Sequence, residues 1–426
     1  MKFTFNSFLN PNLPVGGARV DVLFSVTAEG GGQSTPSARK VIGLIGDNSG
    51  SMGEHNKIGE MKNAMRVAVD QLGPDDEFFV VTFDNRADLV VPLCRADADG
   101  KRRAHALIQR IEANGGTAIS TGLSLARGEF SKRKGAVCQA VLLTDGQNDG
   151  ADQSDLEREL SMGAGLYQAH CRGVGQGWSP KQLRLVADRL VGTLANIADP
   201  SRLADDFRDT LASAMSKSLS DVRLRLWTPK AAEIKGFKQA FPTEIDMFDK
   251  LHAVDQRTVE FKLGAWGEGQ QDYLATFAVT PNNPGSTGTL LCRPSIAFTD
   301  PATGQEVSIE GEKVLIWWSD DASLTSRINA QVAHYTGQAE KAAAIQEGIE
   351  ALQQGRVDVA TVRLGRAAQL ANESGDEGTM RLLRQVVDVQ DAATATVRVK
   401  RDVGKSAMMD LDVASTRTVR ANRASA

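Results

Sequence analysis

From about residue 40, the chain alternates short apolar runs with longer segments whose apolar residues recur at helical spacing. The clearest strand candidates are the runs RKVIGLIG, EFFVVTFD, AVCQAVLLTD and AHCRGVGQG, which begin at residues 39, 77, 136 and 169. Amphipathic stripes lie between them, such as the one formed by Ile58, Met61, Met65, Val69 and Leu72. Strands alternating with helices over residues 39–220 predict an α/β domain, a mostly parallel sheet covered by helices on both faces.

A different pattern follows residue 220. Short alternating strands, among them VRLRLW, TVEFKL, DYLATFAV and TLLCRPSIAF, are separated by the turn-rich stretches PNNPGSTG and TDPATGQ. The early segment ARVDVLFSVTAEG has the same alternation, and the flexible linker GGQSTPSA joins it to the first α/β strand. We therefore expect residues 1–38 and 221–320 to form one antiparallel β-sandwich into which the α/β domain is inserted.

Helical patterns dominate the last quarter of the chain. The long alanine-rich segment that ends near Gly355 is followed by VDVATVRLGRAAQLANES and EGTMRLLRQVVDVQDAA. These segments predict a helical hairpin or bundle over residues 321–395. Residues 396–426 lack a sustained apolar period and carry a basic bias, which predicts a flexible basic tail.

Composition narrows the choice of protein class. A chain of 426 residues predicts two or three domains, and a net charge of −4 gives no reason to expect nucleic-acid binding. The amino terminus has no apolar signal segment, and no stretch approaches the roughly 20 apolar residues needed to cross a bilayer. We therefore expect a cytoplasmic protein that does not bind membranes. The four cysteines form no C-x-x-C pair, which predicts reduced, mostly buried thiols.

Oxygen-bearing side chains follow two of the predicted strands. Asp47, Ser49 and Ser51 occupy alternate positions of GDNSGSMG, directly after the first strand, and Asp145 ends the strand in LLTDG. The carboxyl ends of such strands open onto one edge of the sheet, where ligands bind in open α/β folds. A third loop, NGGTAIS, presents Thr117 after two glycines. The sequence predicts that these five residues meet.

Carboxylates and hydroxyls without histidine or thiolate ligands favour a hard cation. Mg²⁺ is the expected ion, while Mn²⁺ or Ca²⁺ would satisfy the same donors. Two carboxylates approximately neutralise a divalent ion, and the hydroxyls add ligands without charge. If one coordination position faces solvent, a carboxylate from another molecule can complete the shell.

These residues make the sequence similar to the von Willebrand factor A (VWA) family over about residues 39–219. The family's metal-ion-dependent adhesion site consists of D-x-S-x-S, a threonine in a later loop and an aspartate in a T-D-G-like turn, which correspond to Asp47, Ser49, Ser51, Thr117 and Asp145. The resemblance implies that the hydroxyls ligate the metal directly or through water. It also implies that the aspartates largely hold water or outer positions, and that a partner's acidic side chain fills the open position. The flanking segments resemble those of bacterial intracellular VWA proteins and of inter-alpha-trypsin-inhibitor-like architectures.

The leading interpretation is a non-enzymatic adaptor or scaffold that captures an acidic residue of a protein partner through Mg²⁺. A Walker phosphate loop is excluded because Met52 and Gly53 stand where a lysine is needed. Two alternatives remain open: a metal-dependent phosphoester hydrolase, in which the metal acts as Lewis acid, and a structural component of a larger assembly with a vestigial metal site. No evident general base supports the hydrolase.

The predicted tail contains Thr416 and Thr418 beside acidic and basic residues. In a mobile segment both would be accessible to a kinase, and phosphorylation would add about 1.5 to 2 negative charges next to Arg417 and Arg420. Such a site could dock a phosphothreonine-reading domain.

Overall fold

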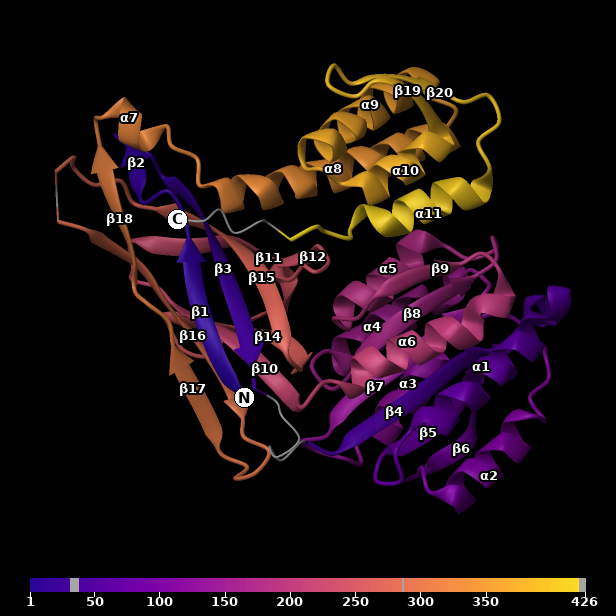
Figure 1. Ribbon diagram of the computed structural model, residues 1–426. Coiled ribbons are helices and arrows are strands. Elements are labelled where there is room, and N and C mark those ends of the chain that lie inside the picture. Colours follow the sequence, from indigo (N-terminus) through magenta and orange to yellow (C-terminus); the bar gives the residue numbers. More distant parts are fainter. Residues whose placement is uncertain (31–37, 286, 421–426) are drawn as a thin grey trace.

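Three parts make up the structure, which we describe from a computed structural model: a β-sandwich, an α/β domain and a helical part (Figure 1). The description covers residues 1–30, 38–285 and 287–420. The predicted linker GGQSTPSA therefore lies outside the described residues except for Ala38, as do residues 421–426 at the end of the predicted tail.

The α/β domain is built on a sheet with strand order β6-β5-β4-β7-β8-β9. Its strands are β4 (Lys40–Asp47), β5 (Glu77–Phe83), β6 (Ala87–Arg95), β7 (Val137–Thr144), β8 (Gln168–Val174) and β9 (Leu194–Ile197). All neighbouring pairs are parallel except β5 and β6. The central strands β4, β5 and β7 are buried almost throughout, as their apolar runs predict. Strand β8 is buried as well, although it contains Gln168, His170 and Arg172.

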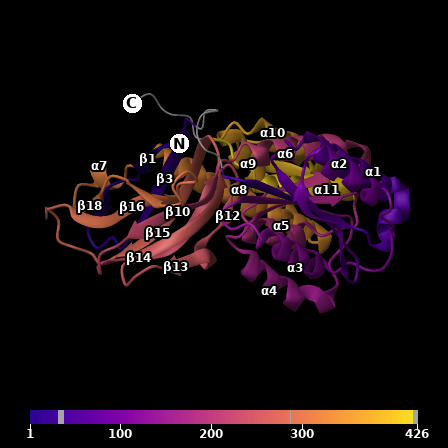
Figure 2. The same ribbon diagram turned by 90° about the horizontal axis from the view of Figure 1, so that it is seen from below.

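Helices cover both faces of this sheet (Figure 2). They are α1 (Lys57–Gln71), α2 (Ala98–Ile108), α3 (Ile119–Phe130), α4 (Gln153–Gly163), α5 (Pro180–Arg189) and α6 (Leu203–Met215). Residues of α1, α2 and α6 share one apolar cluster with the sheet, and residues of α3, α4 and α5 share a second cluster. The predicted α/β architecture is confirmed. It places the carboxyl ends of β4 and β7 side by side at one edge.

The β-sandwich contains strands from both sides of the α/β domain. One sheet has the order β1-β3-β15-β11-β12, and the other has the order β13-β14-β10-β16-β18-β2, with β17 beside β16. The strands are β1 (Lys2–Phe8), β2 (Asn12–Pro14), β3 (Arg19–Glu29), β10 (Leu219–Trp227), β11 (Ala232–Phe241), β12 (Ile245–Asp246), β13 (Leu251–Ala253), β14 (Thr258–Trp266), β15 (Gly269–Val279), β16 (Thr289–Thr299), β17 (Glu306–Glu310) and β18 (Val314–Ser319). Because β3 pairs antiparallel with β15 and both sheets share one apolar core, the predicted insertion is confirmed.

The helical part begins after the last strand of the sandwich. It contains α7 (Ala322–Thr325), α8 (Ala330–Gln353), α9 (Val357–Glu373), α10 (Glu377–Val386), β19 (Val387–Asp391), β20 (Thr396–Val399) and α11 (Lys405–Ser415). Helix α8 connects this part to the sandwich (Figure 1): the Tyr335 hydroxyl near its start donates a hydrogen bond of 2.5 Å to Asp272 of β15. Short 3₁₀ turns occur at Gly50–Asn56, Gly150–Asp152, Pro200–Arg202 and Phe248–Lys250.

The prediction of a flexible tail from residue 396 is wrong for residues 396–420. Strands β19 and β20 form an antiparallel hairpin, and the helix predicted from residue 377 ends at Val386. Helix α11 follows, with Met409 and Val413 packed in an α/β cluster and Leu411 packed in the helical core. Its apolar residues are thus divided between two cores, so the sequence shows no single helical stripe. Two polar contacts, Arg184 with Asp412 and Asn196 with Asp410, fasten α11 to the α/β domain.

The cysteine prediction also agrees with the structure. Cys138, Cys171 and Cys292 are buried, Cys94 is half-buried, and all four are free thiols. No helix in the part of the chain that the structure describes is both long and apolar enough to cross a membrane.

Candidate metal centre

The five predicted site residues lie on loops at the carboxyl edge of the α/β sheet. Asp47 is the last residue of β4, and Asp145 directly follows β7, the neighbouring strand. Both carboxylates are buried, with exposed fractions of 0% and 1%. Ser49 and Thr117 are buried as well, whereas Ser51 is exposed. Four of the five donors are therefore buried, and Ser51 reaches the surface.

Hydrogen bonds join four of these residues into one chain. The backbone N–H of Ser49 donates to Asp47 Oδ1 over 2.7 Å, and Thr144 Oγ1 donates to Asp47 Oδ2. The hydroxyls of Ser49 and Ser51 are 3.2 Å apart, and Ser51 Oγ donates to Asp145 Oδ1 over 2.6 Å. Side chains separated by almost one hundred residues are thus held within direct contact.

Thr117 approaches the same group from the third loop. A Cβ atom placed on Gly146 would lie 2.9 Å from Thr117 Oγ1 and 3.8 Å from Asp47 Oδ2. Both oxygens therefore lie close to Gly146. Backbone hydrogen bonds fasten the loops together, from Gly50 N–H to the Gly115 carbonyl at 3.0 Å and from Asp149 N–H to the Thr117 carbonyl at 2.9 Å. The structure therefore brings together all five residues that the sequence predicts.

Lys57 also contacts this group of residues, which the sequence did not predict. Its ammonium lies 2.5 Å from Asp145 Oδ2 and 3.3 Å from the Ser51 carbonyl oxygen, and its side chain is 13% exposed. Lys57 is the first residue of α1, six positions after Ser51, where a lysine carries no signal of its own. The chain thus supplies a positive charge beside one of the two buried carboxylates.

The burial of Asp47 has an electrostatic consequence. Desolvation raises the pKa of Asp47 to about 6, against the opposing effect of hydrogen bonds from Ser49 and Thr144, while the Asp145 carboxylate raises it further. A buried carboxylate with a raised pKa lacks sufficient positive charge nearby. A cation placed between the two aspartates would supply that charge.

The donor chemistry fits a hard divalent ion. Two carboxylates and three hydroxyls offer only oxygen, which suits Mg²⁺, Mn²⁺ or Ca²⁺ better than a soft metal. No group of three or more His, Cys, Asp or Glu side chains suited to a metal occurs among residues 1–30, 38–285 and 287–420. Any ion held here would thus depend on the hydroxyls of Ser49, Ser51 and Thr117.

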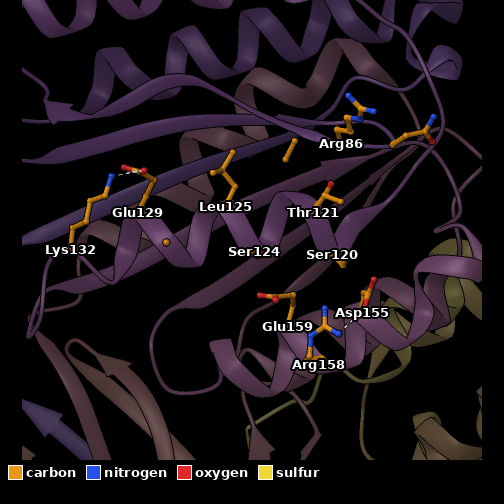
Figure 3. A pocket seen from close by; sticks show the side chains of 13 residues that line it. Arg86, Ser120, Thr121, Ser124, Leu125, Glu129, Lys132, Asp155, Arg158 and Glu159 are labelled. Atoms are coloured by element: carbon orange, nitrogen blue, oxygen red, sulfur yellow. Dashed lines mark hydrogen bonds and ion pairs between the residues drawn. The ribbon is translucent and has the colours of Figure 1, made fainter.

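A groove of about 620 Å³ begins beside this centre and runs between α3 and α4 (Figure 3). Asn85 contacts the loop that holds Thr117, since Asn85 Oδ1 accepts a hydrogen bond from the Gly116 N–H over 3.2 Å. Ser120 lies in the first turn of α3, three residues after Thr117. Leu125 gives the wall an apolar stretch, and Glu129 with Lys132 lies toward the other end of α3.

Thr416 and Thr418 lie apart from the centre and in an ordered segment. The Thr416 carbonyl accepts a hydrogen bond from Glu244 N–H over 2.8 Å, and the Thr418 N–H donates to the Pro242 carbonyl over 3.2 Å. The Thr418 hydroxyl is buried and makes no hydrogen bond. The mobile setting expected for these threonines is therefore wrong, because a kinase could reach Thr418 only after the segment detached. Their phosphorylation stays a prediction from sequence.

Comparisons with known proteins match the fold and its parts. A family model described as von Willebrand factor type A domain matches residues 43–147, and one described as von Willebrand factor type A C-terminal domain matches residues 369–415. The solved structure of a von Willebrand factor type A protein from Catenulispora acidiphila is 40% identical and covers 98% of this chain and 97% of that chain, with a TM-score of 0.92. The ArnB paralog VWA2 from Sulfolobus acidocaldarius shares the fold, with 16% identity, 99% coverage of both chains and a TM-score of 0.62.

Curated relatives are matched over shorter stretches. An uncharacterized protein of Synechocystis sp. is 32% identical over 272 residues, which are 62% of this chain and 62% of that protein. Inter-alpha-trypsin inhibitor heavy chain H4 of Homo sapiens is 30% identical over 155 residues, which are 33% of this chain and 16% of the human protein. The chain thus spans less than two thirds of these relatives.

The identity of 40% to the Catenulispora protein extends over nearly all of both chains, and the matched family models cover parts of the α/β domain and of the helical part. The chain belongs to the von Willebrand factor type A family, a family of protein-interaction modules that bear a metal site.

Proposed function

We propose that this chain is a protein-binding adaptor that holds Mg²⁺ at Asp47, Ser49, Ser51, Thr117 and Asp145 and presents it to an acidic side chain of a partner. The observation that carries the proposal is the convergence of five oxygen donors with only two negative charges. Two carboxylates offset the charge of a divalent ion without exceeding it and the hydroxyls add no charge, so the ion would stay electrophilic and could accept a further carboxylate as a ligand.

The position of the donors supports the binding of a partner's carboxylate to the ion from the protein surface. Four of the five are buried and Ser51 is exposed, so an ion held by them would be approached from the Ser51 side. Three hydroxyls leave coordination positions for water, which an incoming carboxylate can displace. The chain itself carries out no bond-breaking step in this proposal.

The groove between α3 and α4 would receive the partner residues that flank its acidic side chain. Its lining includes Asn85, which is hydrogen-bonded to the Thr117 loop, and Ser120 in the first turn of α3. Metal coordination would then supply attraction to any exposed acid, and the groove would select among partners by shape and apolar contact at Leu125.

Titration calorimetry with Mg²⁺ tests the metal step of this proposal. The EDTA-stripped full chain should bind one Mg²⁺, and Asp47→Ala or Ser49→Ala should weaken binding by at least about tenfold, because each removes an oxygen donor. The control is Asp149→Ala, which removes an exposed carboxylate close to the centre and should leave the affinity within about twofold. Equal Mg²⁺ affinity in the wild type and Asp47→Ala would contradict the proposed centre.

Affinity capture tests the partner step. Immobilised full chain should retain a set of proteins from native lysate in Mg²⁺ and release them in EDTA, and Asp47→Ala should fail to retain them. Partners held equally by Asp47→Ala in EDTA would show that recognition does not use the metal.

A further inference from the structure

A second polar site lies far from the metal centre, at the junction between the α/β domain and the β-sandwich. A cavity of about 270 Å³ opens there. Its walls come from β8, the end of α6, and strands β11, β14 and β15 of the sandwich. Its lining includes Gln168, His170, Lys217, Trp266, Glu268 and Gln270.

The cavity wall contains Lys217, whose hydrogen-bond acceptors in the described part of the chain are uncharged. Lys217 Nζ donates to Gln168 Oε1 over 2.5 Å and to Gln139 Oε1 over 3.3 Å. No carboxylate forms an ion pair with it in the described structure, whereas neighbouring Arg172 is paired with Asp206. Burial lowers the pKa of Lys217 to about 8, as expected for a desolvated ammonium without a counter-charge.

A hydrogen-bond network holds this ammonium in place. Gln139 Nε2 donates to Gln168 Oε1 over 2.9 Å, and Gln168 Nε2 donates to the Val191 carbonyl over 2.9 Å. Gln139 Oε1 lies 3.0 Å from His170 Nε2, and burial holds the pKa of His170 well below its usual value. The imidazole is therefore neutral, and the amide oxygens around Lys217 are fixed by their other bonds. A charged group oriented in this way is prepared for a ligand.

The rest of the cavity suits an anion of limited size. Trp266, which is buried, forms an apolar wall, and Arg420 from the C-terminal segment donates to Gln270 at the rim. Glu268 is the one acidic residue among the described residues that line this cavity, and it is exposed. The cavity volume of about 270 Å³ leaves room for a small molecule.

We propose that this junction binds a small organic anion whose carboxylate or phosphate oxygens accept hydrogen bonds from Lys217. The ligand would supply the missing counter-charge and would contact both the α/β domain and the sandwich. Binding there would therefore stabilise the arrangement of these two parts. The site is separate from the metal centre and does not depend on its function.

Calorimetry on the full chain in EDTA tests this proposal, with sodium succinate and sodium phosphate as the two probes at matched ionic strength. We expect saturable binding of at least one probe, and the stronger of the two identifies carboxylate or phosphate as the preferred group. Lys217→Met should weaken that binding by at least about tenfold, and Lys217→Arg, which keeps the charge, should retain most of it.

The matched control is Lys40→Met. Lys40 Nζ also binds an uncharged oxygen near this junction, the Met215 carbonyl at 2.5 Å, but Lys40 does not line the cavity. This variant should bind the probe as the wild type does. Circular dichroism checks that each variant is folded, and Lys217→Gln replaces Lys217→Met if the latter is not. Absence of saturable binding to either probe, or equal affinity in a folded Lys217 variant that lacks the charge, overturns the proposal.

Discussion

At the scale of single residues, Lys57 is expected to affect how strongly the centre binds a metal ion. Its ammonium contacts Asp145 Oδ2 and the Ser51 carbonyl, so it neutralises part of the charge that would attract a cation. A divalent ion must displace this ammonium or bind beside it. We therefore expect Lys57 to lower the affinity of the centre for a divalent ion.

Lys57→Met should increase the affinity for Mg²⁺ about tenfold, or by about 1.4 kcal/mol, because a competing positive charge is removed. Titration calorimetry on the EDTA-stripped protein measures the change. Lys62→Met provides the control, since Lys62 lies on the same helix and donates a hydrogen bond to the Gln109 carbonyl. Unchanged or weaker Mg²⁺ binding in Lys57→Met would show that the ammonium does not oppose the ion.

His170 gives the fold a dependence on pH. Burial, with Lys217 and Arg172 nearby, holds its folded-state pKa well below 6.5, so the native protein keeps this imidazole neutral while the unfolded chain protonates it. Unfolded molecules then bind more protons below pH 6.5, and the free energy of unfolding falls as the pH drops. The contribution of His170 is fully present above pH 6.5 and is lost progressively below it.

Between pH 7 and pH 5 this single group should cost about 2 kcal/mol of stability. Urea denaturation of the wild type and of His170→Gln at both pH values isolates the effect, because the glutamine does not titrate. The loss of stability on acidification should be smaller in His170→Gln by about that amount. Equal losses in the two proteins would mean that His170 binds its proton over the same pH range in the native and unfolded states, so that its pKa is not lowered by folding.

At the scale of elements, the helical part depends on a buried ion pair between α8 and the start of α10. Lys341 contacts Asp376 and Gln338, and the side chains of Lys341 and Asp376 are 1% and 8% exposed. Asp376 also caps α10 by accepting from the Thr379 N–H over 2.9 Å. The pair therefore fixes where α10 begins relative to α8.

Lys341→Met should lower the free energy of unfolding by about 3 kcal/mol, because it leaves the Asp376 carboxylate buried without a counter-charge. Arg363→Met serves as the control. It breaks the half-exposed pair with Glu347, where the cost should stay below about 1 kcal/mol. Similar losses in both variants, measured by urea denaturation, would rule out a special role for the buried pair.

The groove between α3 and α4 allows metal binding to be separated from partner selection. Ser124→Arg places a long side chain in the groove, so it should reduce capture of the metal-dependent partners while Mg²⁺ affinity stays unchanged. Ser161→Arg, on an exposed position of α4 outside the groove, is the control. Full capture by Ser124→Arg would show that partners bind without using the groove.

At the scale of the whole molecule, the sequence predicts the features that local patterns encode. Buried strands read as apolar runs, and Asp47 and Asp145 could be assigned to neighbouring loops because both follow such strands. The insertion into the sandwich could be predicted because residues 18–30 alternate in the same way as the strands after residue 220. These inferences need only periodicity and the common edge of a parallel sheet.

Features that depend on contacts between residues far apart in the chain could not be predicted from the sequence. Helix α11 divides Met409, Leu411 and Val413 between two cores, so no single apolar stripe marks it. Val387 begins a strand that pairs with Val399, yet no Gly or Pro separates it from the end of α10 at Val386 to mark the change. Lys57 acquires its role only because the fold places it against a carboxylate 88 residues away in the chain.

The central claim is that the five oxygen donors hold one divalent ion. Anomalous diffraction from crystals of the full chain soaked in Mn²⁺ tests it most directly. We predict one strong Mn²⁺ peak bounded by Asp47, Ser49, Ser51, Thr117 and Asp145, with the Lys57 ammonium withdrawn from Asp145. Mn²⁺ peaks only elsewhere, with Lys57 still bonded to Asp145, would contradict the account.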